Sequence, residues 1–315
     1  MVFLDKVDIE RRLKLLRQEI SERPINEELR GWNYDKPPIQ PLFNSIKFGV
    51  SELAGRYCET LRDIYLKRVL NMKFPPNLKV VKGVALHKII KETIYEAKKF
   101  IYDNSRATGI KLINFLSKRS LEAAQDAVTD AEFMLAGNLQ KNEKDLLIEE
   151  CVNTRSFLLT QTAAKLDYAL SKYPHADSDS IVSIAIPPVA ERKVDGSLVG
   201  LSSELSVDIY TPYNAVIDVK TGDVRSFHPL TAAGYALALE SEENIPVDFG
   251  FILYLRFERK EIPSFKAKHF IIGDELRREF IEIRDEAFEI VDSGRDPGMP
   301  NKCPDFCPYY SICQK

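Results

Sequence analysis

The stretch ELSVDIYTPYNAVIDVKTG, residues 204–222, decides the fold of this chain. An alternating segment closes at Asp208, and a short apolar run, 215–219, ends in Lys220. Both patterns predict β-strands, and we expect the two strands to form a hairpin. Side chains two residues apart on a strand share a face, so Asp218 and Lys220 project together. Asp208 is expected to reach the same place from the neighbouring strand.

The remaining sequence divides into a helical half and a mixed half. Apolar residues at three- and four-residue spacing predict helices over 5–21, 59–70, 86–102, 107–137 and 143–173. Patterns rich in β-branched or alternating residues predict strands over 180–190, 201–210, 215–219, 248–257 and 264–272, with helices over 229–240 and 274–292. This order predicts an α/β fold with a mixed sheet flanked by helices.

Four segments follow from these patterns. Residues 1–40 are a helical extension, and 41–180 are a helical part that carries the first cysteine. Residues 181–295 are the α/β core, and 296–315 are a cysteine-rich tail.

Composition excludes several classes of protein. Hydrophobic residues make up 44% of the 315 residues and charged residues 29%, as in ordinary globular proteins. No window approaches 18 uncharged apolar residues, so no membrane-spanning helix is expected. The N-terminus, MVFLDKVDIERRLK, lacks the pattern of a secretory signal, which favours a cytoplasmic location. The net charge of −3 means that a nucleic-acid partner needs a local basic face, for which Lys79, Lys82 and Lys88 are candidates.

Two carboxylates and a lysine on neighbouring strands suit metal-assisted phosphodiester hydrolysis. Aspartate oxygens hold Mg²⁺ or Mn²⁺, and the lysine orients a water molecule or offsets charge on the phosphate. The alternative is a surface ion pair beside a turn, which a lone D-x-K triplet does not exclude. Gly83 is expected to open a helix, and His87 one turn later is a candidate further ligand for Mn²⁺ or else a structural histidine.

Two more side chains are expected on one side of the helix over 229–240. His228 and Tyr235 lie seven residues apart, near the start of that helix. They are candidates for DNA contact, and the alternative is that both belong to the core.

The five cysteines predict a metal site. Cys303, Cys307 and Cys313 fall within the last 13 residues, and one distant thiol would complete a four-cysteine site for an iron–sulfur cluster or zinc. Prolines follow Cys303 and Cys307, and the spacing is irregular, which favours iron–sulfur over zinc. Cys58 is the expected fourth ligand, because Cys151 lies within a helical run and is more simply a buried thiol. A structural role is favoured over a redox role, since metal binding couples to folding.

Taken together, these motifs resemble a known family. The order Gly83-x-x-x-His87, a strand with Asp208, Asp218-x-Lys220 and a helix with Tyr235 is similar to the RecB-type nucleases of the PD-(D/E)xK superfamily. The added cysteines resemble the “Cas four” group of CRISPR-associated RecB-like iron–sulfur exonucleases. The phrases VGLSSELSVDIY, VIDVKTG and LTAAGYALALE are most similar to its archaeal branch, linked to subtype I-A systems.

The resemblance implies roles for individual residues. His87, Asp208, Asp218 and the carbonyl of Val219 would bind the metal ion, and Lys220 would be the catalytic lysine. Tyr235 would contact DNA or the site, and the cysteines would hold a cluster, expected as 4Fe-4S. Two positions depart from the family pattern, Leu205 in place of a glycine and Thr231 in place of a glutamine, and the helical stretch between His87 and Asp208 is long.

The same resemblance implies a function. It predicts a metal-dependent exonuclease acting on single-stranded DNA ends in CRISPR adaptation, which trims spacer precursors and works with the CRISPR integrase. Two alternatives stay open, a DNA-binding adaptation subunit with little activity and a redox-responsive iron–sulfur protein.

Overall fold

The computed structural model of the chain describes residues 6–73, 78–104, 107–135, 139–186, 189–211, 214–258, 261–303 and 307–314. A mixed sheet lies at its centre, with five strands that neighbour one another in chain order. They are β1 (Val189–Val194), β2 (Leu205–Thr211), β3 (Ala215–Lys220), β4 (Phe249–Glu258) and β5 (Ile262–Ile271). Only β3 and β4 are parallel, and the crossover helix α9 (Pro229–Glu243) joins them. The predicted mixed sheet and its order, β-β-β-α-β-β-α, are confirmed.

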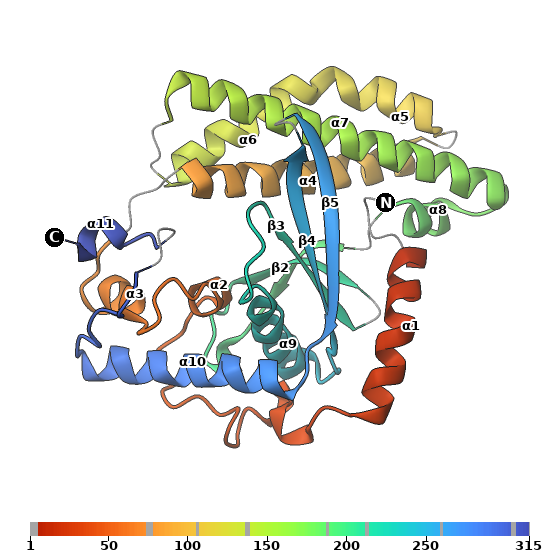
Figure 1. Cartoon of the computed structure of the whole chain (residues 1–315). Coiled ribbons are helices and arrows are strands. Elements are labelled where there is room, and N and C mark those ends of the chain that lie inside the picture. The colour runs from red at the N-terminus through yellow and green to blue at the C-terminus, as the bar shows by residue number, and fades with distance from the viewer. Residues whose placement is uncertain are drawn as a thin grey trace.

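Helices cover both faces of the sheet (Figure 1). On one face lie α4 (Leu78–Asp103), α5 (Gly109–Leu116), α6 (Ser120–Leu135), α7 (Lys141–Lys172) and α8 (Ser178–Ala185). On the other lie α9, α10 (Asp274–Ser293) and α2 (Val50–Ala54), while α1 (Lys6–Glu22) packs against β5 and α8. Shorter helical turns are α3 (Arg62–Ile64), α11 (Tyr310–Cys313), η1 (Glu27–Leu29), η2 (Gly31–Asn33), η3 (Tyr65–Val69), η4 (Ser117–Arg119) and η5 (Ser197–Val199). Across the described residues, no helix has both the length and the apolar character needed to cross a bilayer.

Strand β3 contributes to two hydrophobic cores. Ala215, Ile217 and Val219 are buried in the core beneath α4–α8, and Val216 is buried in the core around α9 and α10. Successive side chains of a strand point to opposite faces, so a strand with helices on both sides is apolar throughout. That is why 215–219 is a continuous apolar run interrupted only by Asp218.

The strand predicted over 180–190 is wrong in its first part. Residues from Ser178 to Ala185 form α8, whose N-terminus is capped by the Asp177 carboxylate, which accepts a hydrogen bond from the Ser180 N–H at 2.7 Å. Ile181 and Ala185 are buried on one side of this helix. A short β-branched run is compatible with a helix or a strand, and here the Asp177 cap favours the helix. The first strand starts only at Val189.

Other predicted boundaries also need correction. The single helix predicted over 107–137 is divided into α5 and α6, and near the division the Leu116 carbonyl accepts a hydrogen bond from the buried Arg155 of α7 at 3.3 Å. The helix predicted over 59–70 is reduced to α3 and a π-helical turn, because Leu61 adopts a φ of 53°. Gly83 does not open a helix, since α4 already runs from Leu78. Asp208 does not close β2 but lies inside it.

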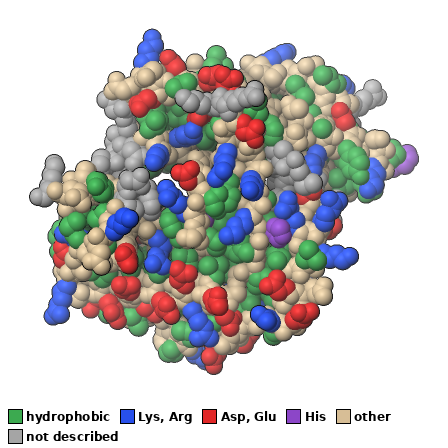
Figure 2. All heavy atoms as spheres, in the orientation of Figure 1, with side chains coloured by type: hydrophobic (Ala, Val, Ile, Leu, Met, Phe, Trp, Pro, Cys, Tyr) green, Lys and Arg blue, Asp and Glu red, His purple; other side chains and the backbone are tan. Residues whose placement is uncertain are grey.

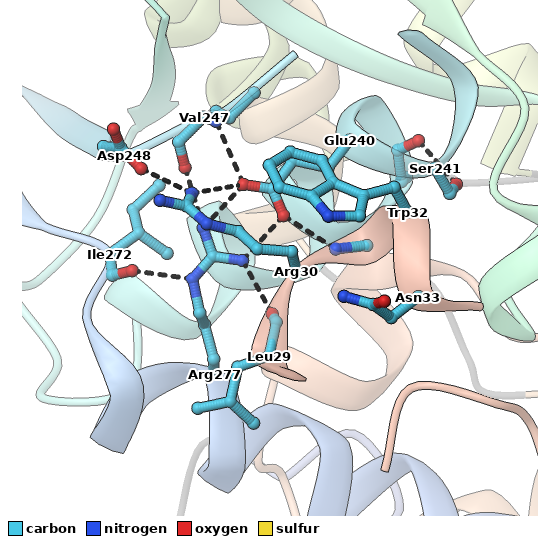
Figure 3. Close-up of polar contacts among 12 residues, drawn as sticks. Leu29, Arg30, Trp32, Asn33, Glu240, Ser241, Val247, Asp248, Ile272 and Arg277 are labelled. Atoms are coloured by element: carbon cyan, nitrogen blue, oxygen red, sulfur yellow. Dashed lines mark hydrogen bonds and ion pairs between the residues drawn. The ribbon is translucent and has the colours of Figure 1, made fainter. Parts of the chain in front are cut away.

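A buried charged network attaches the N-terminal segment to the sheet layer (Figure 3). The Glu240 carboxylate of α9 is fully buried and receives both terminal nitrogens of Arg277, at 2.8 and 2.9 Å. Arg30 donates to it at 2.8 Å, and so do the backbone N–H groups of Gly31 and Val247, at 2.8 and 3.0 Å. Every charge in this cluster therefore has an opposite charge or a backbone partner.

Candidate active site

The two predicted carboxylates face each other where β2 and β3 separate. The antiparallel ladder between these strands contains three pairs and stops at Ile209 opposite Ile217. Beyond this pair the ladder does not continue, and Asp208 lies close enough to Asp218 to raise the pKa of that carboxyl. There the Val219 N–H donates to Asp208 Oδ2 at 2.8 Å instead of to a backbone carbonyl. The predicted hairpin and the shared position of the carboxylates are confirmed.

Asp218 and Lys220 are paired on β3, as the spacing predicts. Lys220 Nζ lies 2.7 Å from Asp218 Oδ2. Among the described residues, that oxygen is nevertheless buried without a hydrogen bond of acceptable geometry. This oxygen therefore has the Lys220 ammonium as its ionic partner and no further donor among the described residues, which leaves it able to accept a cation or another donor.

His87 approaches the carboxylates from the helical layer. Helix α4 crosses the end of β3 at Gly83, where a Cβ atom would lie 3.5 Å from Thr221 Oγ1. One turn later, His87 Nδ1 lies 3.4 Å from Asp208 Oδ1. The structure therefore brings His87, Asp208, Asp218 and Lys220 together from three elements, α4, β2 and β3.

The four groups shift one another's pKa values. Burial and the nearby Asp208 raise the pKa of Asp218 to about 6, against the effect of Lys220. Burial would also raise the pKa of Asp208, but the His87 charge and hydrogen bonds from His87 and Val219 lower it overall. Burial would lower the pKa values of His87 and Lys220, but the carboxylates outweigh it and raise both. The two carboxylates thus stabilise the protonated, positively charged forms of His87 and Lys220.

Tyr235 and His228 occupy the same region. Burial and the charges of Asp218 and Asp208 raise the pKa of Tyr235, so its hydroxyl lies near both carboxylates and keeps its proton. His228 Nδ1 lies 3.2 Å from the hydroxyl of Tyr254. Burial, with the charges of Lys220, Arg225 and Lys268, lowers the pKa of His228 to about 4. Sequence reasoning missed Tyr254, although its strand position opposite Lys220 could have revealed it.

The donor set fits a divalent cation chemically. Two carboxylates and an imidazole supply oxygen and nitrogen ligands that Mn²⁺ or Mg²⁺ accepts. Within the described ranges, no group of three or more His, Cys, Asp or Glu side chains is arranged to hold a metal ion. In the structure, His87 is paired with Asp208 and Lys220 is paired with Asp218. A bound ion would have to replace these contacts.

These residues open into a large cavity of about 1460 Å³. The helices α4 and α6 form one wall, the ends of β3 and β4 form another, and the tail residues Pro308 and Tyr309 lie at the rim. Figure 2 shows a hollow below the helical layer, with acidic and basic side chains interspersed around it. The cavity is thus large enough to admit a polymer segment rather than only a small molecule.

The N-terminal cysteine lies close to the C-terminal tail. The Arg62 guanidinium, four residues after Cys58, binds Asp296 at 2.8 Å and donates to Cys313 Sγ at 3.5 Å. Thr60 donates to the Gly298 carbonyl at 2.7 Å. In Figure 1, α11 accordingly lies beside α3. Cys151 is fully buried in the core beneath the helices, as predicted.

The thiols of the tail interact with Cys58. Burial and the charges of Asp63, Cys58 and Cys313 raise the pKa of Cys307 to about 11. Burial, Cys303 and Cys58 likewise raise the pKa of Cys313, against the effect of Arg62. Cys307 is thus within electrostatic range of Cys58 and Cys313, and Cys313 is within range of Cys303 and Cys58. In the part of the chain that the structure describes, these thiols are not arranged as a group of three or more metal ligands. Of the two prolines noted in the sequence, Pro304 lies outside the described residues.

The cysteine site and the carboxylate site are neighbours. Tyr57 precedes Cys58 and lines the cavity. Burial raises the pKa of the Tyr57 hydroxyl, Lys220 opposes this shift, and Asp63 and Cys307 add to it. The Tyr57 hydroxyl therefore lies within electrostatic range of a residue from each site, which spacing in the sequence does not reveal.

Comparison with known proteins identifies relatives along the whole chain. A family model described as “CRISPR-associated exonuclease Csa1” matches residues 1–315. A protein of Saccharolobus solfataricus named “CRISPR-associated exonuclease Csa1” is 35% identical over 305 residues, which are 95% of this chain and 96% of that relative. A protein of Thermoproteus tenax with the same name is 28% identical over 302 residues, again 95% of this chain and 96% of the relative.

Proposed function

This chain belongs to the family of CRISPR-associated exonuclease Csa1, and from that premise we propose that it is a metal-dependent nuclease that removes nucleotides from single-stranded DNA ends. The observation that carries the proposal is the convergence of His87, Asp208, Asp218 and Lys220 at one wall of a large cavity. We also propose that the sheet and its flanking helices are a RecB-like core of the PD-(D/E)xK superfamily. The order of the strands and the D-x-K pair on β3 support this assignment.

In the proposed reaction, His87, Asp208, Asp218 and the Val219 carbonyl would hold Mg²⁺ or Mn²⁺. When bound, the ion supplies polarisation of the phosphate and a lower pKa for the attacking water. The Lys220 ammonium is kept protonated by Asp218 and offsets the negative charge that develops on the phosphate. The Val219 N–H fixes the orientation of the Asp208 carboxylate. The neutral hydroxyl of Tyr235 is a hydrogen-bond donor beside the carboxylates and a candidate for DNA contact, as is His228.

A nuclease assay with matched variants tests the reaction. Single-stranded DNA labelled at the 5′ or the 3′ end is incubated with Mg²⁺ or Mn²⁺ and wild type, Lys220→Ala or Lys144→Ala. Lys144 is a paired lysine on α7 that binds Glu132, so it controls for loss of a positive charge. We expect Lys220→Ala to lose roughly two decades of activity or more, as for other groups that stabilise developing charge. Lys144→Ala should cut like wild type.

The outcomes separate the candidate functions. Equal cutting by wild type and Lys220→Ala would place the chemistry elsewhere. Absence of cutting by all three proteins, with DNA binding retained, would favour a DNA-binding adaptation subunit with little activity. The label that shortens first gives the polarity.

We further propose that Cys58, Cys303, Cys307 and Cys313 hold an iron–sulfur cluster, expected as 4Fe-4S. The support is the electrostatic influence of Cys58 on Cys307 and Cys313, together with the contacts that join 60–62 to 296–298. Cys58→Ala should lose iron, lose the visible absorption of the cluster and melt at a lower temperature. Cys151→Ala is the matched control, because it removes a buried thiol outside the tail. Zinc without iron in the purified wild type, or loss of iron in Cys151→Ala alone, would overturn the assignment.

The biological setting is also a proposal. The names of the relatives refer to CRISPR, which supports a role for this chain in CRISPR adaptation. We propose that it trims spacer precursors before integration and works with the CRISPR integrase. Trimming of precursor ends in a reconstituted integration reaction, and its loss with Lys220→Ala, is the test.

A further inference from the structure

The cavity beside the carboxylates is not a simple basic groove. Lysine and arginine side chains line it, and so do aspartate and glutamate side chains. Helix α4 carries two of these lysines, Lys82 and Lys88, on either side of His87. With about 100° of rotation per residue, Lys82 lies roughly 140° one way around the helix from His87 and Lys88 roughly 100° the other way. The two lysines thus lie on other sides of the helix than His87, and all three side chains line the same cavity.

Each of these lysines is held by an acidic side chain from another helix. Lys82 Nζ forms an ion pair with Glu150 of α7 and also lies 5.0 Å from the centre of the Phe257 ring. Its side chain is 29% exposed and that of Glu150 is 18% exposed, so this pair is partly withdrawn from solvent.

Lys88 is held at the opposite flank. It forms an ion pair with Asp130 of α6 and lies 3.6 Å from Glu92 one turn later on α4. The Asp130 side chain is 56% exposed, so this pair is open to solvent. Asp130, Glu150 and both lysines all line the cavity.

A polyanion that enters this cavity meets lysines whose charge is already balanced. Phosphate and carboxylate compete for the same ammonium group, because both are anions whose oxygens accept its hydrogen bonds. A phosphodiester backbone in this cavity would pass close to Lys82 and Lys88 as well as to His87. Its phosphates must therefore replace Asp130 and Glu150, and the displaced carboxylates must take up cations from solution.

We propose that Lys82 and Lys88 are phosphate-contacting residues of the cavity and that Glu150 and Asp130 occupy them until a nucleic-acid strand displaces these carboxylates. This inference rests on the proposed nuclease function, since it assigns the binding residues of the same cavity. The two acidic residues then set the affinity for DNA without touching the reacting atoms. They are expected to favour strands that offer several phosphates at once over isolated anions.

Binding in the absence of divalent metal tests the proposal separately from cutting. The affinity for a fluorescent single-stranded oligonucleotide is measured in chelator over a series of salt concentrations. Asp130→Asn and Glu150→Gln should each bind about threefold tighter at low salt, since ion pairs of this kind are weak. The plot of log affinity against log salt should become steeper by about 0.7 in each variant, because no carboxylate has to regain a cation.

Two controls isolate the pairing from general loss of negative charge. Glu132→Gln removes the same charge from α6, but its partner is Lys144 rather than a lysine of α4. It should leave the affinity and the salt dependence unchanged. In a double-mutant cycle, Asp130→Asn should tighten binding only while Lys88 is present and should have no effect on Lys88→Ala.

The outcomes are distinguishable from those for the proposed function. Equal gains in Asp130→Asn and Glu132→Gln, or an unchanged gain in the Lys88→Ala background, would overturn the proposal even if Lys220→Ala abolishes cutting. Conversely, coupled gains in binding would support the two phosphate contacts even if Lys220→Ala cut like wild type. Failure of wild type to bind the oligonucleotide would overturn both proposals.

Discussion

Glu240 and Asp218 are both buried carboxylates, yet their surroundings shift their pKa values in opposite directions. Glu240 receives two guanidinium groups and two backbone N–H groups, and these partners lower its pKa although burial alone would raise it. Asp218 has one ammonium group as its partner and a second carboxylate nearby, and burial raises its pKa to about 6. A satisfied carboxylate stabilises the fold, whereas an unsatisfied one retains the capacity to bind something else.

The largest expected effect comes from breaking the satisfied cluster. Glu240→Gln leaves the buried guanidinium of Arg277 without its counter-charge, which should lower the free energy of unfolding by about 3–5 kcal/mol. Chemical denaturation followed by circular dichroism measures it. Glu242→Gln is the matched control, because this exposed side chain is two residues farther along α9. A loss in Glu240→Gln no larger than in the control would remove the contrast between the two carboxylates.

A smaller effect should appear in the pH dependence of metal-free protein. Unfolded, Asp218 is ionised above about pH 4, but in the folded protein it keeps its proton until about pH 6. The stability that it contributes is therefore present at low pH and lost as the pH rises through 6. Between pH 5 and pH 7, wild type should lose about 1 kcal/mol through this group, and Asp218→Asn should lack this loss. Parallel pH profiles for the two proteins, measured by denaturation in chelator, would contradict the raised pKa.

The smallest effect is expected for a charged side chain that is exposed to solvent and whose partner is also exposed. Glu122 is exposed and pairs with the exposed Arg119 three residues earlier. The Arg119 contact lowers the pKa of Glu122, but water screens such a pair. Glu122→Gln should melt at the same temperature as wild type within the scatter of repeated scans. A clear shift would mean that exposure alone does not separate weak from strong charges in this protein.

Local pattern was sufficient for most of the sheet and for the D-x-K pair. The apolar run at 215–219 and its interruption by Asp218 follow from a strand covered on both faces, and adjacent strands made Asp208 the expected partner. The same reasoning failed at Ser178–Ala185, where a single side-chain cap converts a strand-like run into a helix. The spacing of apolar residues indicates which side chains are buried. It does not indicate whether their backbone groups form the hydrogen bonds of a helix or those of a strand.

Long-range charge pairing could not be predicted. Arg30 and Glu240 are 210 residues apart, and Lys82 and Glu150 are 68 apart. Nothing in either neighbourhood marks the partner, since any acidic residue would fit by charge. For the cysteines the choice was smaller, because the chain has five of them, and Cys151 is buried in a helix as predicted. The assignment of the other four as cluster ligands stays a prediction.

The short ladder between β2 and β3 has a further consequence for how the chain tolerates errors. Three residue pairs, from Ile209 opposite Ile217 to Thr211 opposite Ala215, set the alignment of both carboxylates. A slip by one residue would turn every side chain of one strand to the other face of the sheet. Asp208 would then point away from His87 of α4, with which it pairs in the structure. A molecule therefore has either both carboxylates in the candidate active site or only one of them. Insertions in this hairpin should reduce the fraction of molecules with a complete site and leave the turnover of each complete molecule unchanged.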